Sequence, residues 1–416
     1  MTNKADRGTA SQGAGSSATA AIFRQRGFRQ YWLSQLCAIF ASQMQGVAIG
    51  WQVYEMTQRP LDLGFVGLAQ FLPVCVLALV AGQVADRYDR CRVLLGCLAL
   101  QVLCAVALLV LTIVGNTQVA WVFGVLVLAG AARAFEFPAT AALLPNLVPA
   151  EQFVRAAALT SSARQSASII GPALGGLLYA FAPGVVYGSC VALLLIAATQ
   201  IAVIRLRVVV GARKAVTWES VVAGVAFIRG HSIVLGAISL DLFAVLLGGA
   251  TALLPIYARD ILQVGPWGLG LLRSAPAIGA LSMAALLAYR PIRSGMGSTL
   301  FVTVAVFGLA TIGFALSEHL WLSMGMLVVL GASDMVSVVI RRVVVQVSTP
   351  DEMRGRVSAV ESVFIGASNE LGEFESGVTA AWFGVVPAAL IGGVGTLMIV
   401  GIWSRLFPQL RHVDTV

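Results

Sequence analysis

The sequence predicts an all-α polytopic membrane protein in which twelve transmembrane helices form two pseudo-symmetric six-helix bundles. Of its 416 residues, 58% are hydrophobic and only 11% are charged, whereas a soluble domain carries about 25% charged residues. The mean hydropathy is +0.89, so lipid must be the main solvent of this chain. Two further observations support the prediction: twelve apolar stretches of spanning length, and an uneven distribution of basic residues between them.

Each expected span is an apolar stretch of about 20 residues, the length that crosses a bilayer. The first six lie at about 30–54, 63–85, 92–114, 119–145, 153–180 and 184–205. The longest polar connector follows. The second six lie at about 232–258, 266–289, 298–317, 320–346, 355–380 and 384–406. This six-plus-six pattern favours two related halves.

The spans give an organisation in five parts. We expect a disordered cytoplasmic tail at 1–22, an N-terminal bundle at 23–206, a cytoplasmic linker at 207–231, a C-terminal bundle at 232–406 and a cytoplasmic tail at 407–416. The first tail is rich in Ser, Gly, Ala and Thr and lacks the apolar core of a signal peptide. Within the linker, the segment 218–229 is either an interfacial amphipathic helix or a solvated connector.

Basic residues set the expected orientation. If the N-terminus is cytoplasmic, the inner segments carry 22 Lys and Arg residues and the outer segments carry only Arg59 and Arg259. Both termini are therefore expected on the cytoplasmic side of a bacterial inner membrane. The net charge of +8 follows from this topology and does not indicate nucleic-acid binding.

Catalysis and metal binding find no support in the sequence. The six cysteines and three histidines show no paired or metal-ligand spacing. There is no H-E-x-x-H, no G-x-S-x-G and no Gly-rich nucleotide loop. We expect no enzyme activity, no metal and no cofactor. The expected partners are the lipid bilayer, a small-molecule substrate and protons, and the expected state is a monomer.

A charged motif stands between the second and third spans, Gly82-Gln83-Val84-Ala85-Asp86-Arg87-Tyr88-Asp89-Arg90-Cys91-Arg92. Its glycine permits close helix approach, Asp86 can pair with arginines, and the basic side chains hold the segment at the headgroups. Such a cluster can latch one closed state and release it in another. The motif residues are Gly82, Asp86, Arg87, Asp89, Arg90 and Arg92. The stretch resembles the major facilitator superfamily pattern G-x-x-x-D-R-x-x-R-[RK], with Cys91 in place of the final basic residue.

A second motif lies in the fifth span. Gly171-Pro172-Ala173-Leu174-Gly175-Gly176 resembles the G-P-x-x-G-G motif of exporters in the same superfamily. Proline removes a helix hydrogen bond, and glycines permit bending and tight packing. The resemblance favours efflux, and the alternative is a packing kink formed by Gly171, Pro172, Gly175 and Gly176.

Four further segments narrow the resemblance to one branch of the superfamily. The segments Phe28–Trp32, Ala134–Ala139, Leu143–Pro149 and Thr349–Val357 are similar to the enterobactin-exporter-like branch. This resemblance implies two six-helix bundles around a midplane cavity and export of siderophore-like or drug-like amphiphiles, driven by inward proton movement. Macrolide-efflux-like proteins and lysophospholipid movers belong to the same branch. An importer of the same fold remains the alternative.

Charged and polar residues within the spans are the candidate site, because each is costly in lipid unless it faces a cavity or a partner. Arg133 and Glu136 share one helix face and either pair structurally or contact substrate. Span eleven is the most polar, and its polar arc covers about half of the helix. Glu370 and Glu373 lie one turn apart and would repel each other if both were ionised, so one is expected to hold a proton. The candidates are Glu370, Glu373, Glu361, Asn369, Asp334, Asp241, Arg133, Glu136 and Arg164.

The charge balance within the spans gives one more expectation. Seven acidic residues and three arginines lie there, a balance that suits proton or cation handling better than a strongly anionic substrate. Asp241 and Asp334 either serve the site or bridge helices. The sequence therefore predicts a proton-coupled secondary transporter whose coupling acid lies in the eleventh span.

Overall fold

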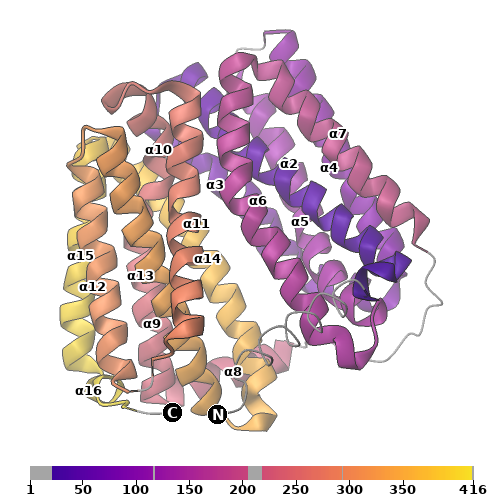
Figure 1. Cartoon of the computed structure of the whole chain (residues 1–416). Helices are drawn as coiled ribbons and strands as arrows, with labels where there is room; N and C mark the ends of the chain where they lie inside the picture. The colour runs from indigo at the N-terminus through magenta and orange to yellow at the C-terminus, as the bar shows by residue number, and fades with distance from the viewer. Residues whose placement is uncertain (1–20, 116–117, 205–217, 293, 415–416) are drawn as a thin grey trace, which may run out of the picture.

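The computed structural model describes residues 21–115, 118–204, 218–292 and 294–414, and these contain helices and turns but no strand. Twelve long helical segments cross the molecule, as predicted (Figure 1). Those of the N-terminal half are α2 (Arg26–Thr57), α3 (Pro60–Arg87), α4 (Arg90–Ile113), α5 (Val119–Leu143), α6 (Phe153–Phe181) and α7 (Pro183–Val203). Those of the C-terminal half are α9 (Ser232–Leu247), α11 (Gly265–Tyr289), α12 (Met296–Ala315), α13 (Leu320–Val347), α14 (Asp351–Phe383) and α15 (Val385–Leu406).

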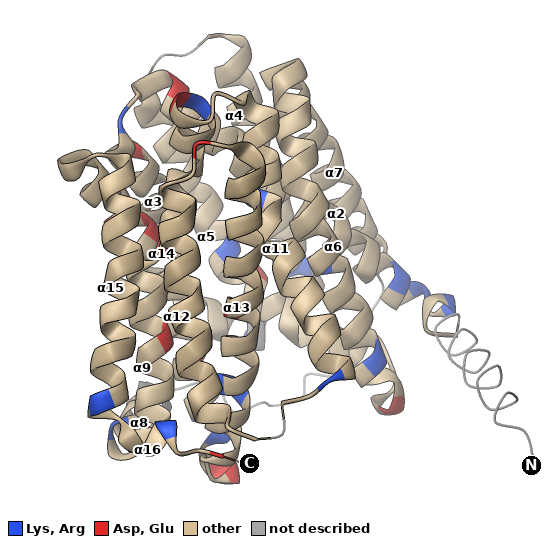
Figure 2. Cartoon of the chain, turned by 60° about the vertical axis from the view of Figure 1, so that its left-hand side comes forward, with Lys and Arg blue, Asp and Glu red and all other residues tan. Residues whose placement is uncertain are grey.

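Hydropathy alone identifies only nine of these segments, within the described residues, as long and apolar enough to cross a membrane. The three that it misses are α2, α6 and α14, although they contain 32, 29 and 33 residues. Each carries a polar face, and a helix that lines a polar cavity does not need apolar side chains all around it. Figure 2 shows that the charged residues gather toward the helix ends and in the interior, away from the surface that lipid covers.

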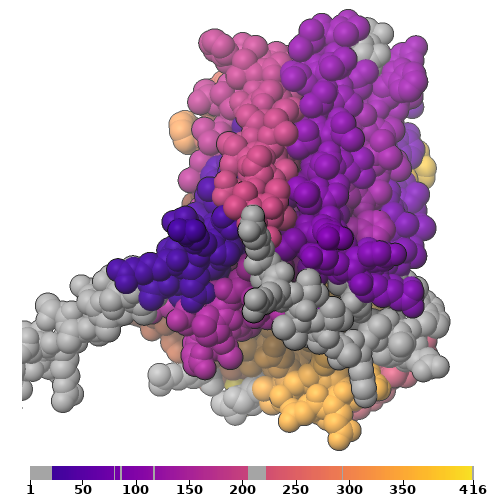
Figure 3. Space-filling view, turned by 90° about the vertical axis from the view of Figure 1, so that its right-hand side faces the viewer, coloured from indigo at the N-terminus to yellow at the C-terminus, as the bar shows by residue number. Residues whose placement is uncertain are grey.

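Each half is a bundle of six spanning segments. In the N-terminal half α2 packs against α6 and α7, α3 against α5, and α4 against α5 and α7. Figure 3 shows α7 beside α4 on the outer face of this half. In the C-terminal half α11 packs against α13, α12 against α13 and α15, and α9 against α14 and α15. The side where α2 begins and α15 ends is called the terminal side below, and the opposite side is the distal side.

The two halves meet mainly on the distal side, where α6 contacts α11 and α3 contacts α14. We call these contacts the distal seam. Glycines make the seam tight: a Cβ on Gly176 would lie 2.4 Å from the carbonyl oxygen of Pro266, and a Cβ on Gly377 would lie 2.8 Å from the Cα of Gly64. Toward the terminal side the halves diverge (Figure 1).

The seventh segment differs from the sequence prediction. A continuous span was predicted at 232–258, but α9 ends at Leu247 and the chain continues through η3 (Ala250–Leu253), α10 (Leu254–Ile256) and the π-helical η4 (Tyr257–Ile261). Gly248 and Gly249 stand at the break. A Cβ on Gly249 would lie 2.5 Å from the carbonyl oxygen of Gly372, so the break brings the chain against α14 where no side chain fits.

The connector between the halves contains a helix, α8 (Trp218–Gly230), so the helical alternative for this segment is confirmed. A Cβ on Gly224 would lie 2.9 Å from the carbonyl oxygen of Arg356, which shows that α8 packs on α14. Residues 207–217 of the predicted linker, residues 415–416 and nearly all of the predicted first tail lie outside the described residues. Ile22, at the end of that tail, belongs to a helical turn and is fully buried beside Phe28. The short helix α16 (Pro408–Arg411) follows α15.

Candidate functional site: a central cavity and a buried charge cluster

A cavity of about 680 Å³ lies between the two halves. All six helices of the N-terminal half, α2 to α7, line it on one side. On the other side it is lined by α11, by α14 and by the segment that follows α9. The polar face of α2 illustrates how the sequence forms this wall. Gln35, Ser42 and Ile49 recur every seven residues, about two helical turns, and all three line the cavity together with Gln43. This face explains why α2 is too polar to register as a span.

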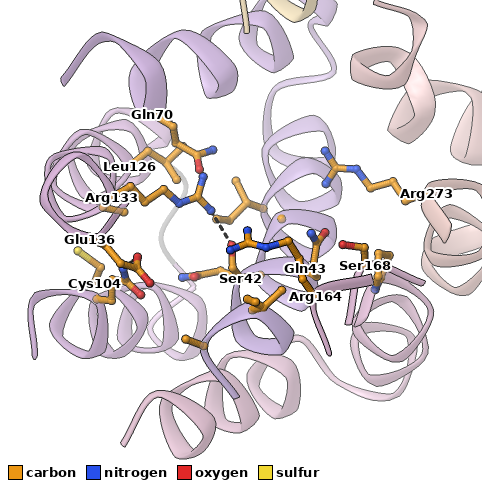
Figure 4. Close-up of a pocket in the computed structure, with 18 of the residues that line it drawn as sticks. Ser42, Gln43, Gln70, Cys104, Leu126, Arg133, Glu136, Arg164, Ser168 and Arg273 are labelled. Atoms are coloured by element: carbon orange, nitrogen blue, oxygen red, sulfur yellow. Dashed lines mark hydrogen bonds between the residues drawn. The ribbon is translucent and has the colours of Figure 1, made fainter. Parts of the chain in front are cut away.

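Charged residues of the N-terminal half form one wall (Figure 4). Arg133 of α5 donates a 2.7 Å hydrogen bond to Ser42 Oγ of α2. Glu136 accepts a 2.6 Å hydrogen bond from Gln101 of α4. Arg133 and Glu136 thus bind different partners, although their spacing had suggested a pair. Arg164 of α6 lies beside Gln43 in the same wall (Figure 4).

The C-terminal half supplies the opposite wall. Arg273 of α11 approaches α2 so closely that a Cβ on Gly46 would lie 3.2 Å from its Nη1. Glu370 and Glu373 of α14 both point at α3, because a Cβ on Gly67 would lie 3.3 Å and 3.0 Å from their Oε2 atoms. The absence of a side chain at Gly67 leaves room for both carboxyl groups.

The described lining contains three arginines and three glutamates: Arg133, Arg164, Arg273, Glu136, Glu370 and Glu373. The spans contain more acidic residues than arginines, but the described cavity lining contains equal numbers of the two. Apolar side chains such as Ile39, Leu126 and Phe137 lie between the charges. The arrangement can hold a molecule that carries both polar and apolar surface.

Two predicted site residues lie in a separate cluster inside the C-terminal half. Arg341 of α13 contacts Asp241 of α9 through Nη1 and lies 3.2 Å from Glu361 Oε1 of α14 through Nε. None of these three lines the cavity. The physical reason lies in the helix period: Glu361 and Glu370 are nine residues apart, which places them on opposite faces of α14. Arg341 is one of the 22 basic residues that the sequence analysis counted in the inner segments as topology determinants, but its side chain is only 2% exposed.

Asp334 and Asn369 also lie outside the cavity. Asp334 of α13 borders a small void that Asp241, Ser333 and Ser337 share. Asn369 is exposed, and its side chain donates a 3.0 Å hydrogen bond to the carbonyl oxygen of Ile365 on its own helix. Of the nine predicted residues, the structure therefore brings five together in the cavity: Arg133, Glu136, Arg164, Glu370 and Glu373.

The charged motif covers the end of α3 and the start of α4, and its described contacts lie within the N-terminal half. Asp89 caps α4 by accepting hydrogen bonds from the backbone N–H groups of Cys91 and Arg92 at 2.8 and 3.4 Å. Arg90 donates to the carbonyl oxygen of Ala142 at 3.4 Å. The side chains of Arg87 and Arg92 are exposed or partly exposed, and the side chain of Asp86 lies outside the described residues.

Gly82 was expected to allow close helix approach, but no helix lies close to it in this conformation. A Cβ added to Gly82 would meet no atom within 4 Å. The reason is the divergence of the halves on the terminal side, which leaves this face of α3 without a neighbouring helix.

The glycine-proline motif in α6 is a packing element. A Cβ on Gly175 would lie 2.7 Å from the Cα of Met44 in α2, and a Cβ on Gly171 would lie 2.7 Å from Gln43 Cβ. Gly176 faces α11 across the distal seam, and Pro172 lines the cavity. The motif thus joins α6 to its own half and to the other half at once.

Sequence reasoning missed a polar contact across the distal side, which we call the distal latch: Tyr54, Arg259 and Asp260. The Tyr54 hydroxyl donates to Asp260, and the Arg259 guanidinium lies 5.6 Å from the centre of the Tyr54 ring. Tyr54 is only 6% exposed, because it packs between the halves. The available signal was Arg259, one of only two basic residues expected on this side.

Among the described residues, no group of three or more His, Cys, Asp or Glu side chains comes together as a metal site.

Known proteins are similar to this chain in sequence and in fold. Residues 17–416 match the family described as "Transmembrane secretion effector" within the major facilitator superfamily. The chain is 26% identical to the enterobactin exporter EntS of Escherichia coli over 92% of both chains. It is 26% identical to the multidrug efflux pump Tap of Mycolicibacterium fortuitum over 88% of this chain and 92% of that protein.

Two further matches differ in extent. Macrolide efflux protein A of Streptococcus pyogenes is 32% identical, but the match spans only 36% of this chain and 38% of that protein's length. The crystal structure of a point mutant of the nucleoside transporter NupG superposes with a TM-score of 0.74 at 12% identity, covering 92% of this chain and all of that one. The fold is that of membrane transporters, and the predicted branch is confirmed. The chain is a multi-pass membrane transporter that belongs to the transmembrane secretion effector family of the major facilitator superfamily.

Proposed function

We propose that this protein exports small amphiphilic molecules by alternating access, with protons moving in the opposite direction. The observation that carries the proposal is the central cavity, which lies between two halves that are joined at the distal seam and diverge on the terminal side. Such a state loads substrate from the terminal side. The positive-inside rule places that side in the cytoplasm, so the conformation is inward-facing.

Export is supported by two features. The glycine-proline motif of α6 resembles the motif of exporters in this superfamily, and its Gly176 packs in the distal seam. The similar proteins carry efflux names: an enterobactin exporter, a multidrug pump and a macrolide efflux protein. In this proposal the halves at 23–206 and 232–406 rock about the cavity as rigid units, and the working unit is a monomer.

The substrate class follows from the lining. Arginines and glutamates stand on both walls, with apolar side chains between them, which suits an amphiphile of siderophore-like or drug-like character. Glu370 and Glu373 lie close together against Gly67. Because two adjacent carboxylates repel each other, one of them takes a proton when the cavity is empty, and substrate binding releases it.

The first experiment compares metabolites in medium and cytoplasm, with and without the protein, in iron-limited and iron-replete cultures. We expect a siderophore-like compound to accumulate inside and to disappear outside when the protein is absent. Unchanged siderophore pools would exclude that class and direct the search to toxic amphiphiles and lysophospholipids. Accumulation of a compound inside only when the protein is present would indicate an importer and contradict the proposal.

A further inference from the structure

We propose that Asp241, Arg341 and Glu361 form a proton-binding site inside the C-terminal half, separate from the substrate cavity. The inference deepens the proposed coupling, on which its role in transport rests. The binding itself does not depend on the substrate or on the direction of transport. We call these three residues the buried triad.

The first argument is charge. One guanidinium faces two carboxyl groups, and the three side chains are only 2 to 12% exposed. With all groups ionised the triad has one uncompensated negative charge, and such a charge away from water is costly. Binding one cation removes that cost.

The second argument is the imperfect pairing of Glu361. Asp241 contacts Arg341 with one oxygen and lies 3.5 Å from the Ser337 hydroxyl with the other. The Nε of Arg341 and the Oε1 of Glu361 are 3.2 Å apart, yet neither has an aligned hydrogen-bond partner. Glu361 is therefore the carboxylate that Arg341 holds less firmly. In the proposed site the proton adds to this carboxylate and gives the neutral acid.

The third argument is space. Two voids of about 10 Å³ each adjoin Asp241, one shared with Asp334 and the other with Arg341 and Glu361. Each is large enough for about one water molecule. Such voids can hold a water that exchanges a proton with the triad, whereas an organic substrate does not fit them. None of the residues of the triad borders the cavity, and Glu361 lies about 14 Å from Glu370 along α14.

The neighbouring helices supply few other charges. Asp334 of α13 shares one void with Asp241. Helix α12 contains no titratable residue, and α15 contains only Arg405 near its end. Arg342 follows Arg341 on α13 and acts on it electrostatically. The charge of the triad therefore depends mainly on its own members, on Asp334 and on Arg342.

The triad also suggests what protonation does. Arg341 lies in α13, Asp241 in α9 and Glu361 in α14. When Glu361 is neutral, Arg341 keeps Asp241 and releases Glu361. Helix α14 is then less tightly held to α13. Since α14 also contacts α3 in the distal seam, protonation acts on a helix that links the two halves.

The test measures proton binding directly. Purified protein carrying E370Q and E373Q is titrated from alkaline to acidic pH in sodium-free buffer, and infrared difference spectra record the C=O stretch of protonated carboxyl groups. The E370Q and E373Q background removes the two cavity acids of α14, and the third cavity acid, Glu136, is the same in every sample and cancels in the comparison of variants. E361Q and D241N are then added one at a time. Each leaves a one-to-one ion pair with Arg341, so we expect folded protein that has lost one protonating carboxyl group. The matched control is E375Q, which removes a carboxyl of the same helix that bonds Thr379; E375Q is expected to retain the triad signal.

Three outcomes decide the proposal. Loss of the same signal in E361Q and D241N, with its retention in E375Q, supports it even if the export experiment fails. An unchanged signal in both variants overturns it, and lower thermal stability with unchanged proton binding shows a structural ion pair. If the carboxylate stays ionised in acid but its spectrum changes when sodium is added, the triad binds a metal cation in place of a proton. That outcome also overturns the proposal.

Discussion

Replacing Gly176 by alanine tests whether the distal seam closes the transport path. The added methyl carbon would lie 2.4 Å from the Pro266 carbonyl oxygen and 2.9 Å from the Gly270 Cα. Ordinary carbon contacts are about 3.5 Å, so α6 and α11 must separate by about 1 Å. Both opposing atoms belong to the backbone and cannot rotate away. Overpacking of this kind costs about 1–3 kcal/mol.

This cost applies only to the state in which the seam is closed. It shifts the equilibrium from the inward-facing toward the outward-facing state by about 5- to 150-fold. The matched control is Gly188→Ala in α7, where an added Cβ would meet no atom within 4 Å. That variant should behave as the wild type.

Spin labels on exposed positions near the distal ends report the shift. Phe181 of α6 and Trp321 of α13 are 83% and 75% exposed, and the labels are introduced after removal of the six native cysteines. Electron-electron distance measurements should show a longer population in Gly176→Ala and an unchanged distribution in Gly188→Ala. Identical distributions for the wild type and Gly176→Ala would refute the reasoning that the seam is the closed gate.

Other predictions concern the latch and the cavity. Tyr54→Phe removes the hydrogen bond to Asp260 and should lengthen the same label distance, by less than Gly176→Ala does, because one hydrogen bond contributes about 1 kcal/mol; no change would show that the latch does not stabilise the closed state. Glu370→Gln and Glu373→Gln should abolish proton-coupled transport in vesicles while leaving folded protein in the membrane; full coupling in both single variants and in the double variant would exclude this pair. Arg273→Gln removes a cation from the cavity wall and should weaken binding of an anionic substrate more than that of a neutral analogue; equal losses for the two compounds would argue against a charge contact.

Much of the fold is readable from the sequence, because lipid imposes a length and a polarity on every span. The span boundaries at α11 and α13, for example, agree with the prediction within two residues. The break after α9 was not predicted, since Gly248 and Gly249 sit in a run that is otherwise apolar. Its cause is a close approach to Gly372, a contact between segments far apart in the chain.

The site was predictable only in part, for the same reason. An ionisable residue in a span must face a cavity or a partner, and this rule drew attention to span eleven. The sequence does not say which of the two applies. Glu370 faces the cavity, whereas Glu361 meets Arg341, a residue that sequence reasoning had assigned to topology. Partner choice depends on the rotation of three packed helices, and no local pattern encodes it.

The most direct test of the account uses the purified protein in liposomes that enclose a pH-sensitive dye, with the compound identified by metabolite analysis. A gradient of that compound should drive protons in the opposite direction, and the Glu370→Gln/Glu373→Gln double variant should lose this proton movement. Transport of the compound with no proton movement, or with protons moving in the same direction, would contradict proton-driven export through the central cavity.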